Sequence, residues 1–94
     1  MRTMTNPRIE NMISATSGNP VANQFKIWTG ATVVFQSYNS TIAKRDFATD
    51  RVTLYNPYWD FYSATTNRYL LQFLNEDSIR DVRAKVESGE YLTE

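Results

Sequence analysis

Cysteine and histidine are both absent from this 94-residue chain. The absence of cysteine excludes disulfides, zinc–thiolate sites and iron–sulfur clusters. The absence of histidine removes the side chain that most often serves as a general base and as a metal ligand. A serine or threonine nucleophile needs a neighbouring base, and only carboxylates and three lysines remain for that role. We therefore expect a protein that is not an enzyme, with no catalytic residues, no cofactor and no metal site.

An excess of charge is also missing, because ten basic and ten acidic residues cancel. Nucleic-acid-binding domains are commonly basic, so neutrality weighs against nucleic acid as the main partner. The three glycines stand alone at positions 18, 30 and 89, which excludes a glycine-rich phosphate loop. No apolar run approaches the roughly 18 residues that a transmembrane helix needs, and we expect no secretory signal. No membrane partner is predicted.

Four β-rich stretches follow an N-terminal segment of different composition. Residues 1–20 are rich in Asn, Ser, Thr, Gly and Pro, which predicts a flexible or strap-like segment. From residue 21 onwards, apolar and polar side chains alternate in runs that short turn signals separate. Short connections favour antiparallel neighbours. The predicted strands are residues 21–29, 31–38, 41–47 and 51–55.

Two helical stretches follow the predicted strands. Residues 67–76 and 78–88 each carry apolar side chains at helical spacing, the pattern of a helix that lies on a sheet. The order of elements predicts an α+β fold, with a small antiparallel four-stranded meander sheet followed by two C-terminal helices packed on one face. Residues 21–94 form a single domain in this prediction.

The stretch WDFYSATTNRYLLQFL, residues 59–74, joins the predicted sheet to the first helix. Its single aspartate, Asp60, lies among aromatic residues, where burial raises a carboxyl pKa toward acid–base use. We favour a structural role, in which the Asp60 carboxylate accepts hydrogen bonds from backbone N–H groups or hydroxyls near the helix start. A hydrolase built on Asp60 is the less favoured alternative. The predicted structural joint comprises Trp59, Asp60, Ser63, Thr65, Thr66, Tyr69 and Phe73.

The aromatic content predicts an interaction surface on the sheet. Two Trp, six Tyr and five Phe exceed what a core of this size needs, and tyrosine is enriched at interfaces. Two short helices cannot cover both faces of a sheet, so an aromatic face is expected to bind a partner protein or a second copy of the chain. Because bases accompany the aromatics, the alternative is a single-stranded nucleic-acid or nucleotide-binding module. The predicted surface comprises Lys26, Trp28, Gln36, Tyr38, Lys44, Arg45 and Arg51.

Two motifs carry a resemblance to a known group. The first is FQSYNSTIA at residues 35–43, and the second is WDFYSATTNRYLLQFL. They resemble an F-x-S-Y-x-S/T-x-I/V-A strand pair and a W-D-Y-S-x-T-T-x-K/R-H/Y-x-x-Q-F-L element shared by short uncharacterised proteins encoded in bacteriophage and prophage genomes. The second motif departs from the shared spacing by one additional aromatic between Asp60 and Ser63. The resemblance covers about residues 21–75, with a weaker similarity in SIRDVRAKVESGEY.

The resemblance implies an origin and a role rather than a chemistry. It implies a small phage accessory protein that acts in the host bacterial cytoplasm. Such proteins often bind host machinery, including defence systems, and redirect or inhibit it. The expected partner is therefore a host or phage protein, and self-association as a homo-oligomer is expected as well.

Overall fold

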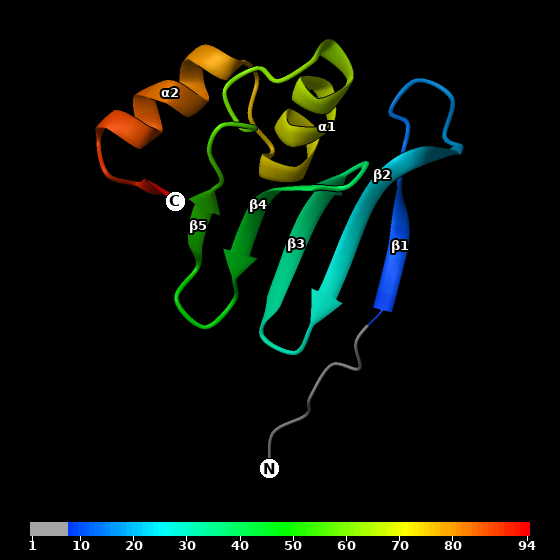
Figure 1. The fold of residues 1–94 in the computed structure, drawn as a ribbon, viewed down its shortest axis with the longest axis horizontal. Coiled ribbons are helices and arrows are strands. Elements are labelled where there is room, and N and C mark those ends of the chain that lie inside the picture. The colour runs from blue at the N-terminus through cyan, green and yellow to red at the C-terminus, as the bar shows by residue number, and fades with distance from the viewer. Residues whose placement is uncertain (1–7) are drawn as a thin grey trace.

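One sheet with two helices at one end makes up the described part of this protein. The computed structural model describes residues 8–94, in which six strands form a single sheet in sequence order. Neighbouring strands are antiparallel, except the last pair, which is parallel. Figure 1 shows both helices gathered at one end of the strands. The elements are β1 (Arg8–Ile13), β2 (Pro20–Thr29), β3 (Thr32–Ser37), β4 (Ser40–Asp46), β5 (Arg51–Leu54), α1 (Ala64–Leu74), α2 (Ile79–Glu87) and β6 (Tyr91–Thr93).

The α+β class is confirmed, but the predicted count of four strands is wrong, because residues 8–94 contain six. Strands β2 to β5 correspond to the four predicted ones. Strand β1 lies within the segment 1–20, which was expected to be flexible or strap-like, and only Met12 of this strand is buried. Its side chains therefore show no alternation that would mark a strand. Strand β6 has three residues, too few to show a period. The rest of the expected flexible segment, residues 1–7, lies outside the described residues.

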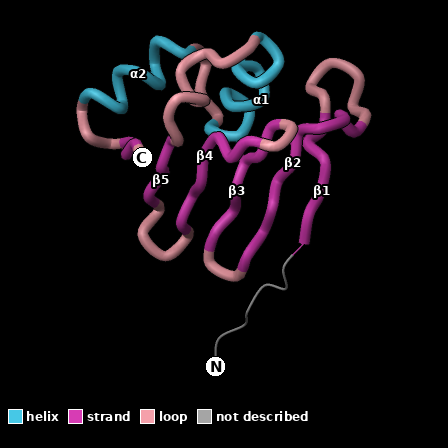
Figure 2. The backbone as a smooth tube through the Cα atoms, viewed as in Figure 1, coloured by secondary structure: helices cyan, strands magenta, loops and turns pink. Residues whose placement is uncertain are grey.

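The β2–β3 hairpin sets which side chains share a face of the sheet. Its turn has two residues, Gly30 and Ala31, because Thr29 lies opposite Thr32. Gly30 has φ +55°, a conformation that two-residue hairpin turns require and that glycine adopts without strain. Figure 2 shows this turn and the β4–β5 turn at the end of the sheet remote from the helices. Trp28 consequently pairs with Val33, on the same side of the sheet as Phe35.

The two faces of the sheet have different surroundings. Phe35 stacks on Phe73 of α1, with ring centroids 5.8 Å apart, and Ser37 bonds to Thr66 of the same helix. Side chains on this side are called the helix-bearing face. The opposite side, which neither helix covers, is called the open face. By strand register the open face carries Ile9, Phe25, Ile27, Val34, Gln36, Lys44, Asp46, Arg51, Thr53 and Leu92.

Side-chain caps start both helices, as the Ser/Thr-rich sequence predicts. Ser63 Oγ accepts a hydrogen bond from the backbone N–H of Thr66 at 3.1 Å, and Ser78 Oγ accepts one from Asp81 at 3.2 Å. Because Ser63 is the cap, α1 begins three residues before the predicted start at residue 67. The α1 helix ends at Asn75, which adopts the left-handed conformation. Neither helix of residues 8–94 is long and apolar enough to span a membrane.

A small polar cluster is enclosed between β2, β3 and α1. Ser37 Oγ and Thr66 Oγ1 lie 2.8 Å apart, and Thr66 Oγ1 also accepts a hydrogen bond from Ser63 at 3.0 Å. Gln24, which pairs with Ser37 across the strands, is fully buried. Among the described residues, neither the amide nitrogen nor the amide oxygen of Gln24 has a hydrogen-bond partner. A buried amide without partners reduces the stability of the fold.

Replacing Gln24 with methionine is expected to raise the free energy of unfolding by about 1–2 kcal/mol, because the side chain keeps its length and loses an unpaired amide. Ser37→Ala is the matched control, since it removes a hydroxyl that is bonded, and it is expected to lower the same quantity by about 1 kcal/mol. Urea unfolding followed by circular dichroism measures both. Loss of stability in Gln24→Met would show that the amide is satisfied by bound water.

Candidate functional site

Cations and aromatic rings gather on the helix-bearing face, beyond the part that the helices cover. The strand register places Arg8, Trp28, Val33 and Arg45 in one row across β1 to β4. Lys26 lies on the same face, because it is two residues before Trp28 in the same strand. Figure 1 shows the C-terminal end of β2 at the bottom of the sheet, away from α1 and α2. The helices therefore leave the side chains at this end of β2 uncovered.

Trp28 is the centre of this group. Its ring stacks on that of Phe47, with centroids 5.8 Å apart and an angle of 8° between the planes. The guanidinium carbon of Arg8 lies 4.6 Å from the centroid of the Trp28 ring, within the range of a cation–π interaction. The indole Nε1–H donates to Glu10 Oε1 at 3.0 Å. These contacts fix the orientation of an aromatic side chain that is only half-buried.

A cavity of about 170 Å³ lies beside the Trp28–Phe47 stack. Val33 is buried, whereas Lys26 and Arg45 are half-buried and Phe47 is 50% exposed. Within residues 8–94, neither Lys26 nor Arg45 forms an ion pair with a carboxylate. We call this cavity the cation–aromatic pocket. Its lining consists of Lys26, Trp28, Val33, Arg45, Phe47 and Phe73.

A second and larger hollow adjoins this pocket. It has a volume of about 400 Å³ and is lined by residues of β1, the start of β2 and Gln72 of α1. Lys26 is a lining residue of both cavities. The Gln72 side chain closes one side by donating to the carbonyl of Ile13 at 2.8 Å. The two hollows are therefore neighbours on the β1–β2 side of the helix-bearing face.

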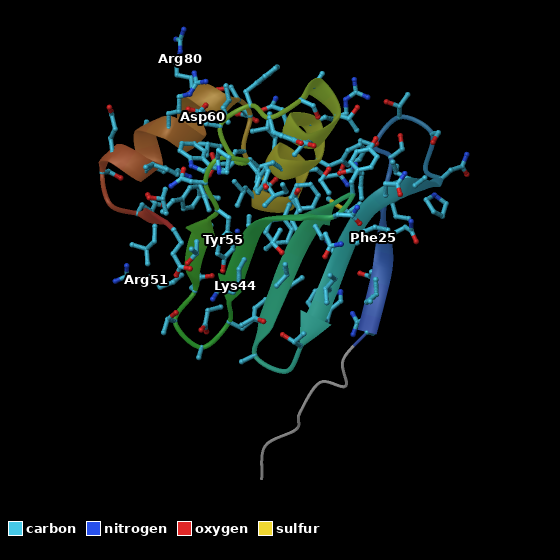
Figure 3. The ribbon with its side chains drawn as sticks, in the orientation of Figure 1. Phe25, Lys44, Arg51, Tyr55, Asp60 and Arg80 are labelled. Carbon is cyan, nitrogen blue, oxygen red and sulfur yellow. The ribbon has the colours of Figure 1, made fainter. Side chains whose placement is uncertain are left out.

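The predicted interaction surface is divided by the sheet. Lys26, Trp28 and Arg45 come together in the cation–aromatic pocket. The remaining four predicted residues do not join them, so the prediction that one face carries all seven is wrong. Gln36, Lys44 and Arg51 belong to the open face, while Tyr38 lies exposed in the β3–β4 turn with φ +55°. Figure 3 labels Lys44 and Arg51, which lie near the β4–β5 end of the sheet.

Sequence reasoning missed three residues of this group. Arg8 belongs to β1, a strand without a clear sequence signal. Phe47 follows β4 directly, and its backbone N–H donates to the carbonyl of Ala31 at 2.8 Å, which holds it beside the β2–β3 turn. Phe73 was assigned to the structural joint, and it both stacks on Phe35 and lines the pocket. The sequence did contain a signal for Phe47, because an aromatic residue in the turn after a strand can pack against a residue of another strand, as Phe47 does on Trp28.

The predicted joint between sheet and helix is mainly structural, with one correction. Trp59 is buried and donates its indole N–H to Asn56 Oδ1 at 2.8 Å. Asp60 was expected to bond near the start of α1, and this is wrong, because its carboxylate pairs with Arg83 of α2 at 2.6 Å. Figure 3 shows Asp60 beside α2. Of the other predicted joint residues, Tyr69 is buried and Thr65 is exposed.

A carboxylate network ties the C-terminal strand to the helices. The Glu76 side chain, which is 8% exposed, accepts a hydrogen bond from Lys85 Nζ at 2.6 Å. It also accepts a short hydrogen bond from the Tyr91 hydroxyl. Glu76 follows α1, Lys85 is in α2, and Tyr91 begins β6. The network therefore connects the end of α1 with α2 and β6, which follow it in the chain.

The protonation states of this network favour a structural role over proton transfer. Burial alone raises the pKa of Glu76, but hydrogen bonds from Lys85 and Tyr91, with the charges of Lys85 and Arg45, outweigh it and lower the pKa overall. Burial, followed by the bond to Glu76, raises the pKa of Tyr91. The pKa of Lys85 is also raised, mainly by its bond to Glu76. At neutral pH each group thus keeps the charge state that the network requires, and none is poised to exchange a proton.

The open face presents an apolar row of different character. Ile9, Ile27 and Val34 are direct neighbours across β1, β2 and β3, and Lys44, Thr53 and Leu92 continue the row to β6. Ile9 is 68% exposed and Leu92 is 42% exposed, whereas Ile27 and Val34 are half-buried. Contiguous apolar side chains on an uncovered sheet face are typical of a protein–protein contact.

The fold and these surfaces define a small α+β protein whose sheet carries one apolar and one cation–aromatic surface. The chain belongs to the family described as a family of unknown function, DUF8033, whose sequence pattern matches residues 8–89. The matched segment thus includes β1 and both helices. Comparisons with curated proteins and with solved structures found no match.

Tyr91→Phe is expected to lower the free energy of unfolding at pH 7 by about 1.5–3 kcal/mol, because it removes a hydrogen bond to a charged group. Because the pKa of Tyr91 is raised, the stabilisation by its hydrogen bond is complete below pH 10.0, the ordinary pKa of tyrosine, and declines as the pH rises above that value. Because the pKa of Glu76 is lowered, the stabilisation by its carboxylate is present above pH 4.5, the ordinary pKa of the group, and is lost as the pH falls below that value. The difference in the free energy of unfolding between wild type and Tyr91→Phe should therefore become smaller at both low and high pH.

Urea unfolding between pH 3 and pH 11 measures this profile, and Tyr62→Phe is the control because Tyr62 is 57% exposed. A difference between wild type and Tyr91→Phe that stays constant with pH would contradict the network.

Proposed function

We propose that this protein is a non-enzymatic binding protein that self-associates through the open face of its sheet. In this proposal it is a phage accessory protein that acts in the bacterial cytoplasm, where it binds and modulates a host or phage protein. The resemblance of residues 35–43 and 59–74 to phage and prophage proteins supports the origin. The observation that carries the binding role is the uncovered apolar group of Ile9, Ile27 and Val34, which are direct neighbours on the open face.

The composition of the open face favours a second copy of the chain as its occupant. At the turn end of this face, Asp46 lies opposite Arg51, so the surface carries both charges beside its apolar row. A two-fold axis can place each of these charges against its opposite on the other copy. The formal net charge of zero adds no general repulsion between copies. The face is therefore chemically complementary to itself.

The area of the open face is sufficient for a weak dimer. Strands lie about 4.8 Å apart and rise about 3.3 Å per residue, so six strands of about six residues present roughly 570 Å² per copy. Two copies then bury about 1,100 Å², just above the lower limit for a specific interface. This size predicts a concentration-dependent dimer, whose open face can exchange its second copy for a partner protein.

Sedimentation velocity over a range of protein concentrations tests the self-association. The wild type is expected to shift from monomer to dimer, and Ile9→Asp and Ile27→Asp are expected to weaken the dimer by at least tenfold, because each buries a carboxylate in an apolar contact. Ile9 is 68% exposed, so its substitution leaves the fold intact. Phe61→Asp is the matched control, since Phe61 is 51% exposed in the loop before α1 and does not belong to the open face.

A strictly monomeric wild type at the highest concentration, or a dimer that Phe61→Asp weakens as much as Ile9→Asp does, would refute the open face as the contact. The partner is tested by capture from bacterial lysate. Proteins retained by wild type and by Phe61→Asp should be absent with Ile9→Asp, and retention of the same proteins by all three would refute partner binding through this face.

A further inference from the structure

Two cations on the helix-bearing face line one cavity and form no direct ion pair within residues 8–94. Lys26 and Arg45 are both half-buried, and within residues 8–94 neither forms an ion pair. Removing a charge from water without a partner is unfavourable. Both residues line the same cavity, so one anionic group placed there can contact both. The pocket is therefore suited to a negatively charged ligand.

Apart from Val33, the remaining walls of the pocket are aromatic. Trp28 and Phe47 stack nearly parallel on one side, and Phe73 of α1 lines the cavity as well. A volume of about 170 Å³ is close to that of an engineered cavity of about 150 Å³ that binds benzene. The pocket thus has room for one planar ring. A carboxylate ligand alone would leave these aromatic walls without a stacking partner.

We propose that the cation–aromatic pocket binds one nucleotide of a single-stranded nucleic acid. The base packs against the aromatic walls, and the phosphate at the rim contacts Lys26 and Arg45. Stacking on aromatic side chains beside cations is the general mode of single-strand binding, and it requires no base-specific hydrogen bond. The proposal concerns the helix-bearing face, so it is independent of the self-association assigned to the open face.

The local charge supports this ligand although the chain as a whole is neutral. Arg8, Lys26 and Arg45 surround Trp28, and Glu10 is the only carboxylate of residues 8–94 bonded to that ring. Three positive charges and one negative charge leave a local net charge of +2. Glu10 lies 3.9 Å from the guanidinium of Arg8 and opposite Lys26 in the strand register, and the charge of Arg45 acts on Glu76. Within residues 8–94 neither Lys26 nor Arg45 forms a direct ion pair with these carboxylates, so both can still contact a ligand.

The adjoining hollow gives a strand a path beyond the first nucleotide. It has a volume of about 400 Å³, shares Lys26 with the pocket and is also lined by Glu10. Lys26 can therefore contact the phosphate that links a nucleotide in the pocket to its neighbour. A free mononucleotide also carries a base and a phosphate, so the experiment must distinguish a nucleic-acid strand from a free nucleotide as the ligand.

Fluorescence anisotropy with labelled oligo(dT) of ten nucleotides measures binding at several salt concentrations. Arg45→Gln and Lys26→Gln are expected to weaken binding about tenfold each. Each should also reduce the slope of log affinity against log salt by about 0.7, the value for one lost phosphate contact on a single strand. Phe47→Ala should weaken binding about tenfold through lost stacking. Phe47 is 50% exposed, so this change leaves the fold intact.

Arg80→Gln is the matched control, because it removes one arginine charge from the exposed side of α2. Figure 3 shows the Arg80 side chain projecting away from the fold. Its affinity and salt slope should equal those of wild type. Competition with unlabelled dTMP then distinguishes the sources: displacement only by oligonucleotide supports a strand, and displacement by dTMP at similar concentration supports a free nucleotide in the same pocket.

Three results would overturn the proposal. The first is no anisotropy change at low salt. The second is an equal loss of affinity in Arg80→Gln and Arg45→Gln, which indicates unspecific charge attraction. The third is displacement of the oligonucleotide by a glutamate peptide together with full binding by Phe47→Ala, which indicates that an acidic protein segment occupies the site.

Discussion

The pairing of Trp28 with Val33 across the β2–β3 hairpin is the contact on which the other surfaces depend. Side chains alternate between the faces of a sheet, so a shift of one residue in this register would move every side chain of β2 to the other side. The two-residue turn at Gly30 and Ala31 prevents that shift. It places Lys26 and Trp28 on the side of Phe35, and Phe25 and Ile27 on the side of Val34.

Two short helices then divide the sheet further. The α1 and α2 helices cover one end of one face, where Phe35, Leu70 and Val82 form part of a fully buried core. The helix-bearing face beyond them keeps its aromatic and basic side chains accessible. The network around Glu76 holds β6 against the helices, which extends the sheet and adds Leu92 to the open face. A small fold thereby presents two chemically different surfaces on opposite sides.

Local sequence patterns predicted what local physics controls. Alternating side chains predicted β2 to β5, and two apolar stripes at helical spacing predicted the two helices, whose N-caps are Ser63 and Ser78. Strand β1 could not be predicted in the same way, because an edge strand with one buried side chain has no alternation. The three residues of β6 form a strand only because β5 provides a partner.

The candidate site could be predicted only in part, for the same reason. Lys26, Trp28 and Arg45 were identified by residue type, but assigning them to one face needs the register of two hairpins, which the sequence pattern alone left open. The pairing of Asp60 with Arg83 joins residues 23 positions apart and depends on how α2 packs. Phe73 was predicted as part of the structural joint, and its second role as a pocket wall depends on how α1 packs on the sheet.

Nuclear magnetic resonance of the labelled protein tests most directly whether the sheet separates two binding surfaces. The methyl groups of Ile27 and Val34 report on the open face, and the indole N–H of Trp28 reports on the cation–aromatic pocket. Dilution is predicted to shift the methyl signals and leave the indole signal unchanged. Addition of oligo(dT) is predicted to shift the indole signal and leave the methyl signals unchanged. A common set of signals that responds to both treatments would contradict the division of the sheet into two surfaces.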